Sequence, residues 1–150
     1  MKVLIIDDSE YKVESLQALL GETSLASEVK VAKSFQSGIR ALQEFRPDLV
    51  LLDMTLPTSE RSDGHLEGRT RLFGGRELLA EMEFASLSPK VIIVTQFDHF
   101  GEPPTSITLK ELLNQLKNRF PTLVIGGVYY DNLNSGWTDE LRPLLQQLPQ

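Results

Sequence analysis

The sequence predicts a single α/β domain, spanning residues 1–150, in which helices cover both faces of a five-stranded parallel sheet. Short apolar runs such as Leu49 to Leu52 carry no polar alternation, which is typical of strands buried on both faces of a parallel sheet. Segments with apolar residues at helical spacing separate these runs. Strand and helix therefore alternate along the chain, and this alternation predicts a parallel sheet with right-handed crossovers.

The chain opens with an expected strand over residues 2–6, followed by a helix. Ser9 is a suitable N-cap for this helix and Gly21 a natural stop. The apolar positions between them follow helical spacing: Val13, Leu16, Leu19 and Leu20. Residues 28–32 alternate valine with charged residues, as expected of a strand at the edge of the sheet.

The second helix is expected to begin at the N-cap Ser34 and to close at Pro47. Its apolar positions are Phe35, Ile39, Leu42 and Phe45. The central strand over residues 49–52 follows and ends at Asp53. Residues 58–73 are polar and rich in turn formers, so we expect an extended, mobile loop over about 58–75 at the carboxyl edge of the sheet.

A third helix is expected from about Arg76, with Leu78, Leu79, Met82 and Phe84 as its apolar positions. The fourth strand covers residues 90–95 and ends at Thr95. Residues 96–104 form a second expected loop at the same edge, because Pro103-Pro104 excludes a helix until just beyond them.

The next helix is expected to start at Ser106 or Thr105 and to end at Pro121. It carries six apolar residues: Ile107, Leu109, Leu112, Leu113, Leu116 and Phe120. The fifth strand covers residues 122–130, where Gly126-Gly127 suggests a bulge or a close contact. Thr138 is the expected cap of the last helix, which is buried through Leu141, Leu144, Leu145 and Leu148.

Acidic residues follow two of the predicted strands: Asp7 and Asp8 after the first, and Asp53 after the third. Parallel five-stranded sheets commonly take the order 2-1-3-4-5, in which strands one and three are neighbours. Ligands bind such sheets outside the carboxyl ends of the strands. The three carboxylates are therefore expected to converge on one crevice, although an acid after a strand is also a common turn residue.

Three carboxylates that lie this close repel one another and raise each other's pKa unless a cation neutralises them. Mg²⁺, which prefers oxygen ligands and phosphate oxygens, is the expected partner. A carboxylate can also attack a phosphoryl group to give an aspartyl phosphate, with Mg²⁺ offsetting the charge repulsion. Thr95 ends strand four at the same crevice, where its hydroxyl could donate a hydrogen bond to a phosphoryl oxygen.

Composition excludes several classes of protein. The chain has no cysteine, so disulfides, thiol nucleophiles and cysteine-ligated metals are ruled out. A net charge of −6 argues against direct nucleic-acid binding. No apolar run approaches the ~20 residues that cross a bilayer, and the N-terminus lacks a signal-peptide pattern. We therefore expect a cytoplasmic protein without membrane contact.

This pattern resembles the receiver domain of two-component response regulators over essentially the whole chain. The resemblance rests on Asp7-Asp8, Asp53 with Leu56-Pro57, Gly75 before Glu77-Leu78-Leu79, and Val94-Thr95. It implies a flavodoxin-like fold in which Asp53 accepts the phosphoryl group and Thr95 is the switch hydroxyl. It further implies that Asp7, Asp8, Asp53 and the backbone carbonyl of Thr55 hold Mg²⁺.

The chain departs from the family pattern in two places. The family carries a lysine at the end of strand five, but residues 126–132 contain none. Its loss removes a charge-assisted contact to the phosphoryl group; Lys110 or an arginine of the inserted loop could substitute. The arginines concerned are Arg61, Arg69, Arg71 and Arg76. Pro57 and Gly75, which stand close together in the family, are separated here by the 58–75 insertion, which could gate the site or dock a partner.

The resemblance implies a stand-alone receiver domain that takes its phosphoryl group from a histidine kinase or a phosphotransfer protein. It would signal by binding a downstream protein, and any enzymatic activity would be slow autophosphorylation and autodephosphorylation. Two alternatives remain open at this point. One is a pseudo-receiver, an interaction module that phosphorylation does not switch. The other is a phosphohydrolase with Asp53 as nucleophile, which the threonine at position 55 disfavours.

Overall fold

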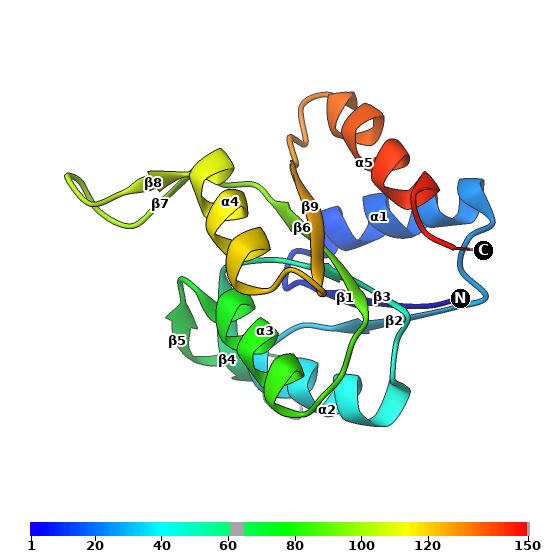
Figure 1. Cartoon of the computed structure of the whole chain (residues 1–150), viewed down its shortest axis with the longest axis horizontal. Coiled ribbons are helices and arrows are strands. Elements are labelled where there is room, and N and C mark those ends of the chain that lie inside the picture. Colours follow the sequence, from blue (N-terminus) through cyan, green and yellow to red (C-terminus); the bar gives the residue numbers. More distant parts are fainter. Residues whose placement is uncertain (61–64, 150) are drawn as a thin grey trace.

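The computed structural model describes residues 1–60 and 65–149, and its central element is a five-stranded parallel sheet. The strands are β1 (Lys2–Ile6), β2 (Glu28–Ala32), β3 (Leu49–Leu52), β6 (Lys90–Thr95) and β9 (Val124–Tyr129). Their order across the sheet is β2-β1-β3-β6-β9 (Figure 1). This is the predicted 2-1-3-4-5 order, so the flavodoxin-like α/β fold expected from the sequence is confirmed.

Helices cover both faces of this sheet, as expected. α1 (Glu10–Thr23) and α5 (Gly136–Gln146) lie on one face. The other face is covered by α2 (Phe35–Phe45), α3 (Gly74–Phe84) and α4 (Leu109–Arg119), and the two layers are visible on opposite sides of the sheet in Figure 1.

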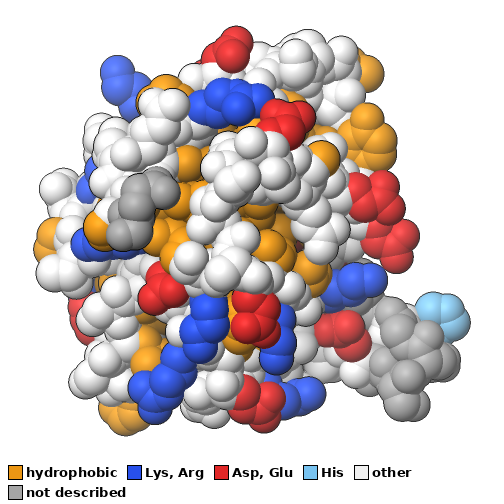
Figure 2. Space-filling model, turned by 90° about the vertical axis from the view of Figure 1, so that its right-hand side faces the viewer, with side chains coloured by type: hydrophobic (Ala, Val, Ile, Leu, Met, Phe, Trp, Pro, Cys, Tyr) orange, Lys and Arg blue, Asp and Glu red, His pale blue; other side chains and the backbone are white. Residues whose placement is uncertain are grey.

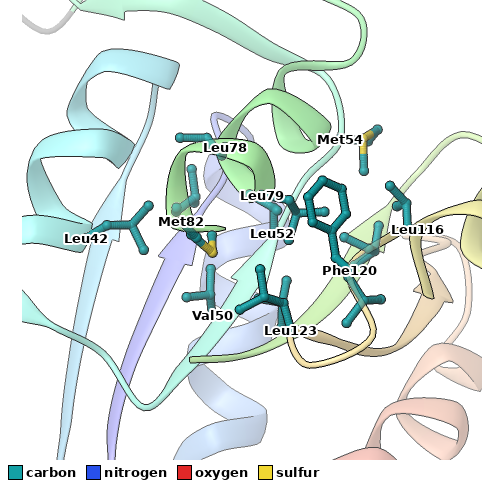
Figure 3. Packing of buried hydrophobic residues seen from close by; sticks show 14 of the residues in the cluster. Leu42, Val50, Leu52, Met54, Leu78, Leu79, Met82, Leu116, Phe120 and Leu123 are labelled. Carbon is teal, nitrogen blue, oxygen red and sulfur yellow. The ribbon is translucent and has the colours of Figure 1, made fainter. Parts of the chain in front are cut away.

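The apolar runs of the strands supply both cores, because successive side chains point to opposite faces. Val50 and Leu52 pack beneath α2 and α3, where Leu42, Leu79 and Met82 meet them (Figure 3). Leu49 and Leu51 face the other way, toward α1 and α5. Every residue of β3 is at most 1% exposed, which explains why its sequence shows no polar alternation.

The predicted starts of α1 and α2 are confirmed by their capping contacts. The Ser9 side chain accepts a hydrogen bond from the Lys12 amide, and Ser34 and Ser37 form a reciprocal capping box. The predicted end of α1 at Gly21 is wrong by two residues. The helix continues to Thr23 and closes at Ser24, whose φ of 55° gives the left-handed conformation that ends many helices.

The segments predicted as loops at the carboxyl edge of the sheet contain two β-hairpins. β4 (Leu56–Glu60) pairs antiparallel with β5 (Leu66–Arg71), so the expected loop over 58–75 is mostly a hairpin followed by the start of α3. β7 (His99–Phe100) pairs with β8 (Ile107–Thr108) in the second segment. In Figure 1 the β7–β8 hairpin projects from the body of the domain, whereas β4–β5 lies beside α2 and α3. Backbone pairing, rather than an apolar pattern, orders these polar segments.

Three helix boundaries differ from the predictions. α3 begins at Gly74 rather than Arg76, and its residue Phe84 is 88% exposed rather than packed. α4 begins only after Thr108, because Ile107 is paired in β8. Thr108 is the N-cap, and its hydroxyl accepts a hydrogen bond from the Glu111 amide. α5 begins at Gly136, two residues before the expected cap Thr138.

The early start of α5 follows from the turn that precedes it. The Asp131 carboxylate accepts from the Leu133 amide, and the Asn134 side chain accepts from the Gly136 amide at 2.9 Å. Asx side chains therefore satisfy amides that would otherwise require a helix cap.

In the part of the chain that the structure describes, no helix combines the length and apolarity needed to cross a bilayer. Figure 2 shows one side of the molecule, on which lysine and arginine side chains interleave with aspartate and glutamate. On that face the charges do not form a patch of one sign.

Candidate functional site

The sheet order brings the three predicted acids together at the carboxyl ends of β1 and β3. The Asp53 amide donates to the Ile6 carbonyl and the Asp7 amide to the Ala32 carbonyl, both at 2.9 Å, so the strand ladder continues into the acids. One carboxylate oxygen from each of Asp7, Asp8 and Asp53 lies within 4.8 Å of the others. The convergence expected from the strand order is therefore present, while the roles of these residues remain predictions.

Asp53 is buried, with 1% of its surface exposed, and its two carboxylate oxygens differ. Oδ1 accepts a hydrogen bond from the Met54 amide at 2.8 Å. Oδ2 is buried and, among the described residues, meets no hydrogen-bond donor. Burial raises the pKa of this carboxyl from 3.8 to about 7; Lys12 opposes the increase and the neighbouring acids add to it.

Asp7 is equally buried but has partners for both carboxylate oxygens. Oδ1 accepts from the Ser9 amide at 2.9 Å, and Oδ2 forms an ion pair with Lys12 Nζ at 2.8 Å. Burial raises the pKa of Asp7 above its usual value, and Lys12 pulls it back. Asp8 is only partly buried, so of the three acids it lies nearest to solvent.

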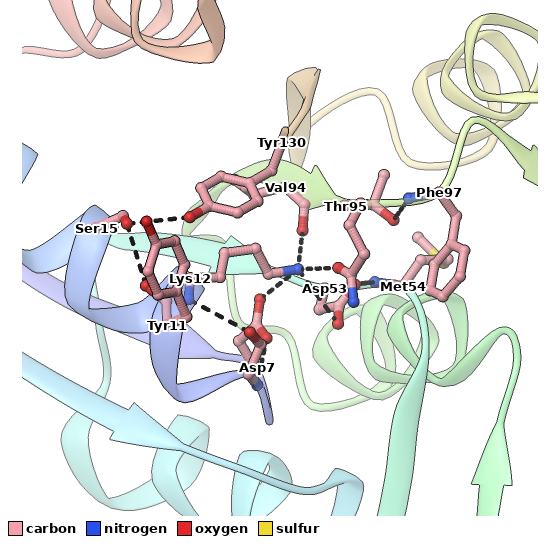
Figure 4. A network of polar contacts seen from close by, with 12 residues as sticks. Asp7, Tyr11, Lys12, Ser15, Asp53, Met54, Val94, Thr95, Phe97 and Tyr130 are labelled. Carbon is pink, nitrogen blue, oxygen red and sulfur yellow. Dashed lines mark hydrogen bonds and ion pairs between the residues drawn. The ribbon is translucent and has the colours of Figure 1, made fainter. Parts of the chain in front are cut away.

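Lys12 was not singled out from the sequence, yet it is the cation at the centre of this cluster (Figure 4). Its side chain is 1% exposed. Nζ donates to the Val94 carbonyl at 3.2 Å and to Gln96 Oε1 at 2.5 Å, and it lies 3.5 Å from Asp53 Oδ2. Asp7 and Asp53 are therefore bridged by a lysine from the first turn of α1.

A sequence signal for Lys12 does exist. Position 12 stands four residues before Leu16 and seven before Leu19, so it belongs to the buried stripe of α1. A lysine in such a stripe is almost never fully buried without a partner. Glu10 and Glu14 stand only two residues from Lys12, but residues at that spacing do not face each other on a helix. Asp7 and Asp8, directly before the helix, are the remaining nearby acids and are therefore candidate partners.

Thr95 and Thr55, the other predicted site residues, lie at the same edge. Thr95 ends β6, is fully buried, and its hydroxyl accepts from the Phe97 amide at 3.2 Å. The hydroxyl of the half-buried Thr55 donates to the Leu72 carbonyl at 3.2 Å. The role of the Thr55 backbone carbonyl as a metal ligand stays a prediction.

Gly75, a residue in the first turn of α3, allows that helix to lie directly against Asp53 and Met54, which follow β3. Its amide donates to the Met54 carbonyl at 2.9 Å. A Cβ at this position would lie 2.7 Å from the Asp53 carbonyl oxygen, which is closer than real Cβ contacts come. The glycine expected from the sequence pattern is thus required by close backbone approach.

The carboxyl end of β9 bears two tyrosines where the family pattern has a lysine. Tyr129 is 42% exposed, whereas Tyr130 is buried, shares a hydrogen bond of 3.0 Å with the Ser15 hydroxyl and packs with its ring tilted against Trp137. Trp137 is itself buried and packs the last helix onto the core. The bulge or close contact predicted at Gly126-Gly127 is confirmed, since the β6–β9 register shifts beside it.

The cations expected to replace that lysine are engaged elsewhere or lie outside the described residues. Arg71 pairs with Glu77 at 2.8 Å, Arg76 donates to the Gln115 side chain, and Lys110 is exposed on α4. Residues 61–64, with Arg61, are outside the described part, and the structure does not describe the side chain of Arg69. Among the described residues, the cation at the acids is Lys12.

The two histidines, His65 and His99, are both exposed, and neither joins the acid cluster. The two aromatic residues of the segment after β6 have different environments: Phe97 is 44% exposed, whereas Phe100 is buried in the core beside Phe73. A cavity of about 270 Å³ opens beside Lys12. It is lined by Ser9, Tyr11, Lys12, Gln96, Tyr129, Tyr130, Asp131 and Asn132.

Comparisons with known proteins agree with this geometry. The family model of the response regulator receiver domain matches residues 3–109. An uncharacterized protein of Sinorhizobium fredii is 32% identical over 95% of each chain. The Detocs response regulatory protein DtcB of Enterobacter cloacae is 29% identical, covering 99% of this chain and all of DtcB.

Solved structures show the same fold at low sequence identity. The receiver domain of a LuxO repressor protein from Vibrio parahaemolyticus superposes with a TM-score of 0.63 at 15% identity, covering 97% of this chain and 87% of that chain. The response regulator domain of Thermotoga maritima CheB gives a TM-score of 0.63 at 18% identity, with 98% and 94% covered.

Proposed function

This chain belongs to the response regulator receiver-domain family, and we propose that it accepts a phosphoryl group on Asp53 in a Mg²⁺-dependent reaction. The observation that carries the proposal is the state of Asp53 Oδ2. This oxygen is buried at the carboxyl edge of the sheet and accepts no hydrogen bond from the described residues, although the Lys12 ammonium lies 3.5 Å away as an ion-pair partner. A carboxylate oxygen that accepts no hydrogen bond keeps its lone pairs for a phosphorus atom.

In the proposed transfer, Asp53 Oδ2 attacks the phosphorus atom of the donor and forms a P–O bond. The bond between phosphorus and the donor atom breaks, and its electron pair leaves with the donor, which takes a proton from solvent. The product is an aspartyl phosphate. A histidine kinase or a phosphotransfer protein, both of which carry phosphohistidine, is the proposed donor.

The acid cluster fits a hard divalent cation. Asp7, Asp8 and Asp53 offer oxygen atoms within 4.8 Å of one another, which is the donor type that Mg²⁺ prefers. We propose that these three carboxylates and the Thr55 carbonyl hold it. When bound, Mg²⁺ offsets the repulsion between the acceptor carboxylate and the phosphoryl oxygens.

Thr95 is the proposed switch residue. Its hydroxyl accepts from the Phe97 amide, and it would turn to donate to a phosphoryl oxygen on Asp53. Loss of the contact to Phe97 would release the loop that follows β6, and the change would reach the face formed by α4, β9 and α5. A downstream protein that binds this face is the proposed output.

We further propose that the chain acts as a stand-alone receiver in the cytoplasm. The similarity to DtcB supports this role, because DtcB is described as a response regulatory protein and is matched over its whole length. Self-catalysed gain and loss of the phosphoryl group would be slow side activities rather than its purpose.

A titration with beryllofluoride, which mimics a phosphoryl group, tests the proposal. Trp137 is a suitable reporter, because its ring contacts Tyr130, which is hydrogen-bonded to α1 at Ser15. We expect a saturable, Mg²⁺-dependent change in its fluorescence that the Asp53→Asn variant lacks. A wild-type protein that gives no response, by fluorescence or by amide chemical shifts, would overturn the proposal.

One observation favours a second candidate, the pseudo-receiver. Lys12 already bridges Asp7 and Asp53, so the acids have a cation of their own. In a pseudo-receiver this ion pair would be purely structural and Mg²⁺ would not bind. Calorimetric titration with Mg²⁺ separates the candidates. A receiver that can be phosphorylated binds the metal, whereas a pseudo-receiver whose acids are neutralised by Lys12 does not.

A further inference from the structure

We propose that Lys12 is the residue that binds the phosphoryl group, performing from α1 the task for which the end of β9 has no lysine. The inference rests on the proposed function of Asp53 and extends it to a residue of another element. Lys12 Nζ lies 3.5 Å from Asp53 Oδ2, the oxygen that would bear the phosphoryl group. A phosphoryl group on that oxygen would therefore form next to the ammonium.

The ammonium is fixed in place before any phosphoryl group arrives. It has three N–H donors and three acceptors at hydrogen-bonding distance: Asp7 Oδ2, the Val94 carbonyl and Gln96 Oε1. Asp53 Oδ2 is a fourth and longer contact, an electrostatic one rather than a hydrogen bond. The charge therefore faces Asp53 without occupying the oxygen that reacts.

Gln96 is the acceptor that can yield to a phosphoryl oxygen. Asp7 and Val94 are buried and lie in or directly after the strands, whereas Gln96 is exposed and begins the loop after β6. Its amide oxygen is neutral, and a charged phosphoryl oxygen accepts a stronger hydrogen bond from an ammonium. On phosphorylation, Lys12 would keep its two buried partners and exchange Gln96 for the phosphoryl group.

Lys12 and Gln96 both line the cavity of about 270 Å³, so Gln96 has open space beside it when it releases the ammonium. Tyr129 at the end of β9 lines the same cavity and contributes a phenol instead of a cation. Lys12 forms no covalent bond in this step and keeps its protons; it neutralises the negative charge on the phosphoryl oxygens.

The test compares Lys12→Met with Lys33→Met. Lys33 is a matched control because it is an exposed lysine that pairs only with Glu10 at 3.5 Å among the described residues. Beryllofluoride affinity is measured by Trp137 fluorescence at saturating Mg²⁺, and Mg²⁺ affinity by calorimetry. We expect Lys12→Met to bind beryllofluoride about 10- to 100-fold more weakly while its Mg²⁺ affinity is unchanged or higher.

A second variant keeps the proposal testable if Lys12→Met does not fold. Gln96 is exposed, and Gln96→Ala removes the neutral acceptor that a phosphoryl oxygen must displace. We expect this variant to bind beryllofluoride as tightly as the wild type or up to about 10-fold more tightly. Weaker binding would mean that Gln96 supports the ligand, and it would overturn the exchange.

The outcomes also separate this inference from the proposed function. If the wild type responds to beryllofluoride and Lys12→Met responds with equal affinity, Lys12 is only structural and the inference alone fails. Equal losses of Mg²⁺ and beryllofluoride affinity would likewise overturn it, because Lys12 would then merely organise the acids. A wild type that does not respond at all would overturn the proposed function and this inference together.

Discussion

The first turn of α1 and the carboxyl end of β9 border the same cavity, but only one of them carries a cation. In α1, Lys12 is buried against Asp7 and Asp53. At the end of β9, Tyr129 is exposed and Tyr130 is turned into the core against Trp137. A charge near the acids can thus come from either element, because the site is defined by where side chains meet in space.

The two elements would connect a phosphoryl group to the fold in different ways. A lysine at the end of β9 would link the phosphoryl group directly to that strand. In its proposed role, Lys12 would link the group to α1, and the hydrogen bond between Ser15 of α1 and Tyr130 reaches the residue that follows β9. Phosphorylation would then act on the last strand through the first helix.

The largest expected effect comes from removing the α1 cation in the absence of metal. Lys12→Met leaves Asp7 and Asp53 buried without their counter-charge, which we expect to lower the free energy of unfolding by about 3–5 kcal/mol. Urea denaturation in EDTA measures this change. Added Mg²⁺ should restore part of the loss, and Lys33→Met should stay within about 0.5 kcal/mol of wild type. Equal stability of both variants would mean that the acids do not need Lys12.

A smaller effect is expected at Gly75, where α3 packs against the residues that follow β3. Gly75→Ala places a methyl group 2.7 Å from the Asp53 carbonyl oxygen, so the residues after β3 or α3 itself must shift. We expect a loss of about 1–3 kcal/mol in unfolding free energy, together with weaker Mg²⁺ binding. Gly21→Ala is the control: it has open space in α1 and should gain about 0.5–1 kcal/mol. A Gly75→Ala protein with wild-type stability and Mg²⁺ affinity would contradict the close contact.

Moving the cation from α1 to β9 tests whether the two positions are interchangeable. Tyr129 is exposed and lines the cavity beside Lys12, so a lysine there can reach the same space. In the Lys12→Met background, we expect Tyr129→Lys to recover up to about tenfold in beryllofluoride affinity. Tyr129→Met in the same background should recover nothing. Equal affinities of these two double variants would show that β9 cannot deliver a charge to the site.

The stability of the metal-free protein is also expected to depend on pH through Asp53. Burial raises the pKa of Asp53 from 3.8 to about 7 even though Lys12 opposes the increase. Because the pKa in the folded protein is the higher one, the stability that this group contributes is complete below about pH 4 and is lost as the pH rises through about 7. Denaturation midpoints across this range should fall more steeply for wild type than for Asp53→Asn. Parallel curves would refute the contribution of Asp53.

The sheet and the acids were predictable because both depend on local patterns. The run from Leu49 to Leu52 marks a buried strand, and the strand order then places Asp53 beside Asp7. Lys12 was missed because its role depends on how α1 is rotated against β1 and β3, which no single segment encodes. Position 12 lies on the same buried face of α1 as Leu16 and Leu19, which indicates burial. A lysine is nevertheless typical of exposed positions, so its charge obscured this indication.

The hairpins were missed for a different reason. Residues 58–73 show neither alternation nor an apolar run, so their polar composition favoured a loop. Residues 56–60 and 66–71 are ordered by backbone pairing of β4 with β5, which side-chain patterns do not report. The same holds for Ile107, which stands among the apolar residues expected in the next helix but is paired in β8.

The central claim is that Asp53 accepts a phosphoryl group, and mass spectrometry tests it most directly. Wild-type and Asp53→Asn proteins are incubated with acetyl phosphate and Mg²⁺, and their intact masses and peptides are compared. We predict that the wild type gains one phosphoryl group, located on the peptide that contains Asp53, and that the variant gains none. A wild-type protein whose mass is unchanged, or a phosphoryl group found on another residue, would contradict this account.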